Sequence, residues 1–261
     1  MVNFQIASDL HIERMTGVVR ATDFLKPVAP TLVLAGDIGS LYLYGQLKAF
    51  LRECCDMFEN VLYIPGNHEF YRVQGYSEAS FEELLGRVAR LDRSIPNLTT
   101  LYRGVVELHG VMIIGCTLWS NPMLHKIPPY IVRNSTLRRV LRYRSEHIAA
   151  REMIERGLKL AACRTQNVLV VTHHSPTFRV LSPQKIDDEY RSLYASDLET
   201  LWSSRVLHTW VYGHTHHNCD ETYEEEGHSV RVVSNQLGKG KDTTLLAPRP
   251  YSHEFIINIP A

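Results

Sequence analysis

The sequence predicts a mixed α/β fold. Short apolar runs alternate with amphipathic helical patterns through the first hundred residues, which is typical of parallel strands joined by helices. The second half instead contains a hairpin signal and further short apolar runs. We therefore expect one mixed sheet or two packed sheets, with helices on the outside. No internal repeat or low-complexity linker divides the chain, so we expect a single domain over residues 1–261.

Five apolar runs each end abruptly in a cluster of polar residues. Uninterrupted runs of this length, bounded by turn-forming residues, are typical of strands that are buried on both faces. We expect these strands at residues 4–7, 32–35, 61–64, 168–171 and 209–212.

Between the first strands, apolar residues follow a helical spacing that predicts two amphipathic helices. One stripe consists of Leu47, Phe50, Leu51, Cys54 and Phe58, and the other of Phe81, Leu84, Leu85, Val88 and Leu91. Further along, His109-Gly110 separates the apolar runs 105–108 and 111–114, which predicts a β-hairpin. Two more strands are expected at residues 229–233 and 255–259.

Residues 120–165 differ from the rest of the chain because they are first punctuated by proline and then helical over a long stretch. We expect a cap-like insertion that lies over the strand ends. Its arginines between residues 133 and 144 have no acidic residue among them, and guanidinium groups of this kind bind substrate phosphates. The alternative is an ordinary solvated helix face. Arg133, nearest the loop, is the candidate substrate-binding residue.

The composition argues against several classes of protein. The 28 Lys and Arg residues balance 28 Asp and Glu residues, so nucleic-acid binding by overall positive charge is not favoured. The amino terminus lacks a signal-peptide pattern, and no run approaches the roughly 18 apolar residues of a membrane span. The five cysteines show no C-x-x-C spacing and fit a reducing compartment. We expect a cytoplasmic protein that does not bind membranes.

Histidine is unusually frequent, at 13 of 261 residues. Histidines and acidic residues follow the five predicted strands, and α/β sheets bind ligands beyond such strand ends. Oxygen and imidazole donors suit Mn²⁺, Fe, Zn²⁺ or Mg²⁺. They do not suggest a structural zinc site, which would be lined by cysteine thiolates. The number of oxygen and imidazole donors exceeds the need of one tetrahedral ion and so predicts a two-metal site. The candidate donors are Asp9, His11, Asp37, Asn67, His68, His173, His174, His214 and His216.

These residues belong to five short motifs that occur in a fixed order. The motifs are Asp9-Leu10-His11, Gly36-Asp37, Gly66-Asn67-His68-Glu69, Thr172-His173 and Gly213-His214-Thr215-His216. With them the sequence resembles the calcineurin-like metallophosphoesterases over residues 9–216. The resemblance implies an α/β/β/α sandwich of two packed mixed sheets flanked by helices. It also implies a binuclear metal-dependent phosphoesterase, either a phosphatase or a phosphodiesterase.

The resemblance further implies a role for each motif residue. His68 would lie outside the metal shell and assist the leaving group as a general acid or hydrogen-bond donor. A hydroxide bridging two divalent ions, with manganese as the first candidate, would attack a phosphomonoester or phosphodiester in line. The implied ligands are Asp9, His11 and His216 for one ion, Asn67, His173 and His214 for the other, and Asp37 for both.

Two features depart from the phosphoprotein-phosphatase branch of the family. In that branch a second aspartate, three residues after the Gly-Asp motif, supports the catalytic histidine, but here this position is Ser40, followed by Leu41. The lone-histidine motif continues as His174-Ser175-Pro176 rather than as two glycines. These departures favour the small, diverse phosphoesterases and leave open what orients His68. Either His173 or His174 could be the ligand, and its place at the strand end favours His173.

Two other functions are compatible with the same motifs. A non-catalytic scaffold of this fold would bind a protein partner, but such a protein is expected to lose ligands or the histidine after Asn67, and none is lost here. A nuclease would share the metal motifs, although zero net charge does not favour it. The substrate that we expect is therefore a small phosphate ester.

Overall fold

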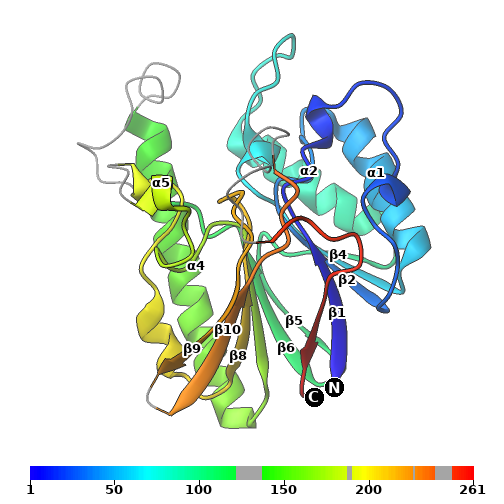
Figure 1. The fold of residues 1–261 in the computed structure, drawn as a ribbon. Coiled ribbons are helices and arrows are strands. Elements are labelled where there is room, and N and C mark those ends of the chain that lie inside the picture. The colour runs from blue at the N-terminus through cyan, green and yellow to red at the C-terminus, as the bar shows by residue number, and fades with distance from the viewer. Residues whose placement is uncertain (122–136, 187–189, 226, 239–248) are drawn as a thin grey trace.

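The computed structural model describes residues 1–121, 137–186, 190–225, 227–238 and 249–261 (Figure 1). Two mixed β-sheets pack face to face, and helices cover their outer faces. This arrangement confirms the predicted α/β/β/α architecture. Within the part of the chain that is described, no helix has both the length and the apolar character needed to cross a bilayer.

The first sheet has the strand order β11-β1-β2-β3-β4. Strands β1 to β4 are parallel, and β11 is antiparallel to β1. The short edge strand β4 was not predicted, because only one of its three side chains is an apolar, buried one. The bounds are β1 Val2–Ala7, β2 Thr31–Ala35, β3 Asn60–Ile64, β4 Leu98–Thr100 and β11 Ile256–Ile259.

Helices α1 (Tyr44–Met57) and α2 (Phe81–Ser94) cover the outer face of this sheet. Both confirm the predicted apolar stripes, whose central residues are buried in one cluster. Helix α2 begins with a capping box, in which the Ser80 hydroxyl accepts from the Glu83 N–H and the Glu83 carboxylate accepts from the Ser80 N–H.

The second sheet has the order β5-β6-β7-β8-β10-β9, with β6, β7, β8 and β10 parallel. The predicted β5–β6 hairpin is confirmed. Its two turn residues, His109 and Gly110, have φ values of 52° and 83°, as a type I′ turn requires. The bounds are β5 Arg103–Leu108, β6 Val111–Cys116, β7 Val168–Thr172, β8 Leu207–Val211, β9 Asp220–Glu225 and β10 His228–Val233.

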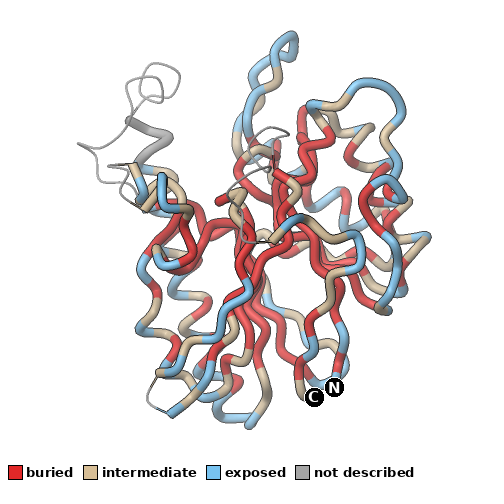
Figure 2. Tube along the Cα trace, viewed as in Figure 1, coloured by how far each residue is buried: buried red, intermediate tan, exposed pale blue. Residues whose placement is uncertain are grey.

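The central strands are buried on both faces, which explains their unbroken apolar runs. In β2, Leu32 and Leu34 pack under the helices, whereas Val33 and Ala35 face the core between the two sheets. A strand with one solvated face would instead alternate apolar and polar residues. Figure 2 shows that the buried residues continue from these strands into the loops at their upper ends.

Helix α4 (Leu137–Arg164) connects β6 to β7 and covers the outer face of the second sheet. Its residues Ala150, Ile154 and Leu158 pack in the core there. Arg142 bonds Glu82 of α2 at 2.7 Å, so this arginine links two helices. Residues 122–136, including Arg133, lie outside the described residues. The cap-like insertion and the role of Arg133 therefore stay predictions.

Candidate metal centre

The loops that follow β1, β2, β3, β7 and β8 converge at the carboxyl ends of the parallel strands. Three groups of side chains there could each hold a metal ion, because the ligand atoms within each group lie within 4.8 Å of one another. The groups are Asp9, His11 and His216 (the Asp9 group); Asp37, His173 and His214 (the Asp37 group); and a third with His11, Asp37 and His68. The structure thus brings together residues of all five motifs, which lie between Asp9 and His216 in the sequence.

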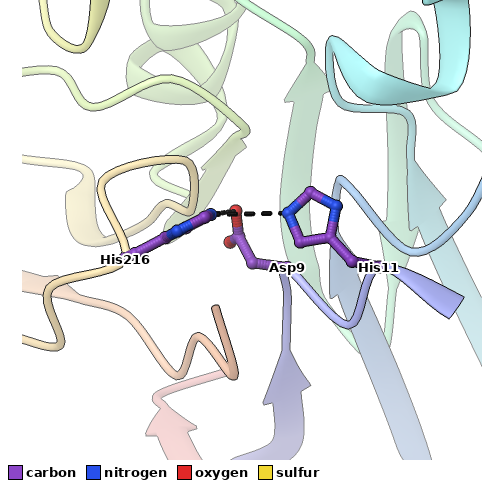
Figure 3. A group of neighbouring side chains, drawn as sticks. All are labelled: Asp9, His11 and His216. Atoms are coloured by element: carbon purple, nitrogen blue, oxygen red, sulfur yellow. Dashed lines mark hydrogen bonds and ion pairs between the residues drawn. The ribbon is translucent and has the colours of Figure 1, made fainter. Parts of the chain in front are cut away.

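In the Asp9 group, three donor side chains meet at one point (Figure 3). Oδ1 of Asp9 lies 3.3 Å from Nε2 of His216, and that nitrogen lies 3.4 Å from Nε2 of His11. Both oxygens of Asp9 accept the backbone N–H of His214 at 3.1 Å. The carboxylate from the β1 loop is therefore held in place by the main chain of the β8 loop.

In the Asp37 group, His173 is completely buried and both of its ring nitrogens face oxygen atoms. Nδ1 donates to the Ala35 carbonyl at 2.9 Å, while Nε2 lies 2.9 Å from Oδ1 of Asn67 and 3.2 Å from Oδ1 of Asp37. Burial opposes protonation of this ring, but the carboxylates of Asp37 and Asp9 raise its pKa to about 9. A metal ion bound at Nε2 would take the place of a proton on this nitrogen.

The neighbouring His174 lies differently. Its Nδ1 is 3.1 Å from the Thr117 carbonyl, and its ring packs against that of His214 with centroids 4.1 Å apart. Burial and the nearby His173 lower the pKa of His174 to about 3, so this ring is neutral. His173, and not His174, belongs to a candidate metal group.

Asp37 faces both groups. Its Oδ1 lies 3.2 Å from His173 in one group, and its Oδ2 lies 3.7 Å from Nε2 of His11 in the other. Burial raises the pKa of Asp37, but the charges of His173, His68 and His11 outweigh it and hold the pKa well below its usual value. Oδ2 is buried and accepts no hydrogen bond from any described residue. Such an orphaned carboxylate oxygen fits a position between two cations.

The backbone of the motifs is strained. Five of the nine described non-glycine residues with positive φ belong to them, with φ between 50° and 69°. Such conformations cost on the order of 1–3 kcal/mol each and persist where the surroundings impose them. Here cross-loop bonds do so, since Asp9 N–H donates to Gly36 and His11 N–H donates to the Asp37 carbonyl. The five residues are Asp9, His11, Asp37, His214 and His216.

The glycines of the motifs allow the loops to approach closely. A Cβ atom at Gly66 would lie 2.3 Å from Oδ1 of Asp37, and one at Gly36 would lie 2.4 Å from Nδ1 of His173. At Gly213 it would lie 2.7 Å from Oδ2 of Asp9. Glycine is therefore required by the contact itself at each of these motif positions.

Glu69 is a site residue to which sequence reasoning assigned no role. Its buried carboxylate ties the β2 loop to the β3 loop. Burial and the charge of Asp37 raise its pKa to about 7. Its only sequence signal is its place at the end of the Gly-Asn-His motif. It accepts backbone N–H groups of Asp37, Ile38, Gly39 and Gly66 at 2.8–3.2 Å, and the Tyr63 hydroxyl at 3.0 Å.

Glu13 is a second residue that sequence reasoning missed. It lies two residues after the Asp-x-His motif, and its Oε1 accepts the Nδ1 hydrogen of His11 at 3.0 Å. Burial opposes protonation of His11, but this bond and nearby carboxylates raise its pKa. With Nδ1 bonded in this way, Nε2 of His11 is free to bind a metal.

His68 lies at the edge of the site, with its side chain 17% exposed. Its backbone N–H donates to Oδ1 of Asp37 at 2.8 Å, and its ring packs against those of His11 and Tyr71, with centroids 4.8 Å apart in both cases. That His68 lies outside the metal shell stays a prediction, because it forms a candidate group with His11 and Asp37.

Comparison with known proteins agrees with this geometry. The Calcineurin-like phosphoesterase family matches residues 3–218. An uncharacterized protein of Acanthamoeba polyphaga mimivirus is 24% identical over 275 residues, which cover 94% of each chain. The crystal structure of phosphopantetheinyl hydrolase from Mycobacterium tuberculosis has the same fold, with a TM-score of 0.63, 18% identity and coverage of 99% and 98% of the two chains. The chain belongs to the calcineurin-like phosphoesterase family.

Proposed function

We propose that the protein hydrolyses small phosphate esters with the help of two divalent metal ions. The observation that carries this proposal is Asp37, whose two oxygens face the two candidate groups and of which one is buried without a partner. The Asp9 group would hold one ion, and His173 and His214 with Asn67 would hold the other. Ions bound there would make a water molecule a better nucleophile and offset the negative charge of the phosphoryl oxygens.

His68 is the proton donor in this proposal. Its ring is partly exposed beside Asp37, so it can face a substrate that enters from solvent. As the bond between phosphorus and the leaving oxygen breaks, its electron pair stays on that oxygen, which takes a proton from the His68 ring. Asp9, Asp37 and His173 are buried, so the substrate approaches from the side of His68 and His216.

The oxygen and imidazole side chains of the two groups indicate which metal ions to test. Oxygen and imidazole ligands suit manganese, which we would test first, followed by iron, zinc and magnesium. A reducing cytoplasm remains the location that we predict. Both phosphomonoesters and phosphodiesters are proposed as substrate classes, and one pair of chromogenic esters distinguishes them.

Reconstitution of the metal-free protein tests the proposal. The protein is stripped of metal, reloaded with each ion and assayed with p-nitrophenyl phosphate and bis(p-nitrophenyl) phosphate, while bound metal is counted by mass spectrometry. We expect two ions per chain and hydrolysis of at least one ester. Two bound ions without hydrolysis of any ester would contradict the enzymatic proposal and favour a scaffold.

The His68→Ala variant tests the role of the proton donor. We expect both ions to stay bound while turnover falls by about 10²-fold or more, as for loss of a general acid. Loss of one ion would instead make His68 a ligand. His253→Ala, which removes an exposed histidine outside the site, is the matched control and should change neither quantity.

A further inference from the structure

We propose that Glu13 is the positioning residue for His68, which it orients for proton donation. The inference rests on the proposed phosphoesterase function, in which His68 protonates the leaving group. The Glu13 carboxylate would then have two tasks, because it also orients His11.

Glu13 lies between the rings of His11 and His68. It lies in the short helix η1 (Ile12–Arg14), directly after the Asp9-x-His11 motif, and its side chain is only 9% exposed. Its Oε1 lies 3.0 Å from Nδ1 of His11 and 4.0 Å from Nδ1 of His68. The rings of His11 and His68 are nearly perpendicular, at 86°. The two distances show that one carboxylate oxygen faces Nδ1 of both rings.

The second carboxylate oxygen of Glu13, Oε2, is buried and has no hydrogen-bond partner among the described residues. A buried carboxylate oxygen without a partner calls for a ligand or a contact that forms in another state. Oε1 already lies 4.0 Å from Nδ1 of His68, and a rotation of the carboxylate would bring Oε2 to the hydrogen on that nitrogen while Oε1 keeps its bond to His11. Catalytic hydrogen bonds are often long before the substrate binds and shorten in the complex.

Neither Arg14 nor Ser40 can take over the role of Glu13 at His68. Nε of Arg14 lies 3.5 Å from Oε1, but its side chain is 51% exposed. Ser40, which stands where a supporting carboxylate was expected, uses its hydroxyl to accept the Tyr42 N–H at 3.2 Å. Asp37 of the β2 loop also lies near His68, but in the proposed function its oxygens face the two metal groups. Glu13 of the β1 loop is therefore the carboxylate that is left to orient the His68 ring.

Glu13 would determine which nitrogen of His68 reacts. A carboxylate at Nδ1 keeps a hydrogen on that atom and leaves Nε2 to deliver the transferred proton. When the bond between phosphorus and the leaving oxygen breaks, the oxygen keeps the electron pair and takes the Nε2 proton. His68 is then neutral, still bonded to Glu13 through Nδ1, and regains a proton from water.

The kinetic test compares two leaving groups of similar shape. Phenyl phosphate has a poor leaving group that needs protonation, whereas p-nitrophenyl phosphate has a good one. In Glu13→Gln loaded with Mn²⁺, we expect kcat to fall roughly 10- to 100-fold for the phenyl ester and about twofold or less for the p-nitrophenyl ester. An equal loss for both esters, or loss of metal, would mean that Glu13 acts only through His11 and would overturn the inference.

A double-mutant cycle adds a second criterion. If Glu13 acts mainly through His68, Glu13→Gln should reduce phenyl phosphate turnover in a His68→Gln background by no more than the about twofold that its bond to His11 explains. Additive losses would contradict the inference. The control is Arg14→Gln, which removes the other charged contact of Glu13 and should change turnover of both esters by about twofold at most. A loss equal to that of Glu13→Gln would assign the effect to the pair with Arg14 instead.

An NMR measurement tests whether Glu13 contacts His68, and it does not depend on enzymatic activity. The ring ¹⁵N and ¹H signals of His68 and His11 are compared by NMR in wild type, Glu13→Gln and Arg14→Gln, each loaded with diamagnetic Zn²⁺ and saturated with inorganic phosphate. We expect Glu13→Gln to shift both rings and Arg14→Gln to shift neither. An unchanged His68 signal in Glu13→Gln overturns the inference, whereas a wild-type protein inactive on every ester would overturn the proposed function alone.

Discussion

The Asp9 group and the Asp37 group each contain one carboxylate and two histidines, but their histidines are oriented by different means. In the Asp37 group, Nδ1 of His173 donates to the Ala35 carbonyl and Nε2 of His214 to the Leu193 carbonyl. In the Asp9 group, Nδ1 of His11 donates to the side chain of Glu13. Main-chain atoms therefore orient one group, and a side chain orients part of the other.

A histidine that is oriented by the main chain keeps its orientation as long as the fold is intact, whereas one that is oriented by a side chain loses it through a single substitution. The Ala35 carbonyl belongs to β2, so it stays beside His173 as long as the sheet exists. Glu13 follows the β1 loop and can be replaced without disturbing a strand. We therefore expect the Asp37 group to be coupled to stability and the Asp9 group to be open to adjustment by side chains.

The largest expected effect comes from Asp37, which faces both groups. In Asp37→Asn we expect a loss of activity of about 10³-fold or more and a lower content of both ions, because each loses a charged ligand worth several kcal/mol. Metal content and turnover are measured on the same sample. Retention of both ions and of the full rate would show that Asp37 does not bridge the groups.

The next effect comes from the close packing of the loops around the Asp37 group. In Gly66→Ala the new Cβ would lie 2.3 Å from Oδ1 of Asp37, so either the loop or the carboxylate must move. We expect a fall in the free energy of unfolding of about 1–3 kcal/mol, together with loss of metal binding. Gly86→Ala in α2 is the control, because nothing lies near its Cβ and alanine favours a helix. Equal stability of the two variants would contradict the packing argument.

A direct comparison of the groups uses the metal-free protein. In His173→Ala we expect the free energy of unfolding to fall by about 3 kcal/mol, because a fully buried ring is lost and the Ala35 carbonyl is left unpaired. In His216→Ala, where the ring nitrogen Nε2 faces the side chains of Asp9 and His11, we expect a smaller fall of about 1–2 kcal/mol. Urea unfolding measures both, and similar values would show that the two groups are equally coupled to the fold.

The smallest effect comes from His147 of α4, outside both groups. Burial lowers its pKa, and its Nδ1 lies 3.1 Å from the Leu118 carbonyl. His147 thus binds a proton more readily in the unfolded chain than in the folded protein. Its contribution to the free energy of unfolding is therefore complete above about pH 6.5 and decreases as the pH falls below that value. In His147→Gln this decrease should be shallower, by at most about 1.4 kcal/mol per pH unit. Parallel curves for metal-free wild type and variant would contradict this assignment.

The sequence predicted the central strands and the motif order for a physical reason. Strands such as β2 are buried on both faces, so local composition alone identifies them. Strand β4 was missed because its one buried apolar residue makes no pattern. The role of Glu69 was missed as well, because most of its partners are backbone N–H groups, which every residue except proline carries.

By itself, the sequence determined which donor groups stand at the strand ends, because each follows a short apolar run that ends in turn-forming residues, as is typical of a buried strand. Tertiary structure decided which of them meet. Of the adjacent residues His173 and His174, only His173 reaches Asp37 and Asn67, since packing against Thr117 holds the other ring away. Glu13 faces His68 because two distant loops cross, and no pattern within either loop records that contact.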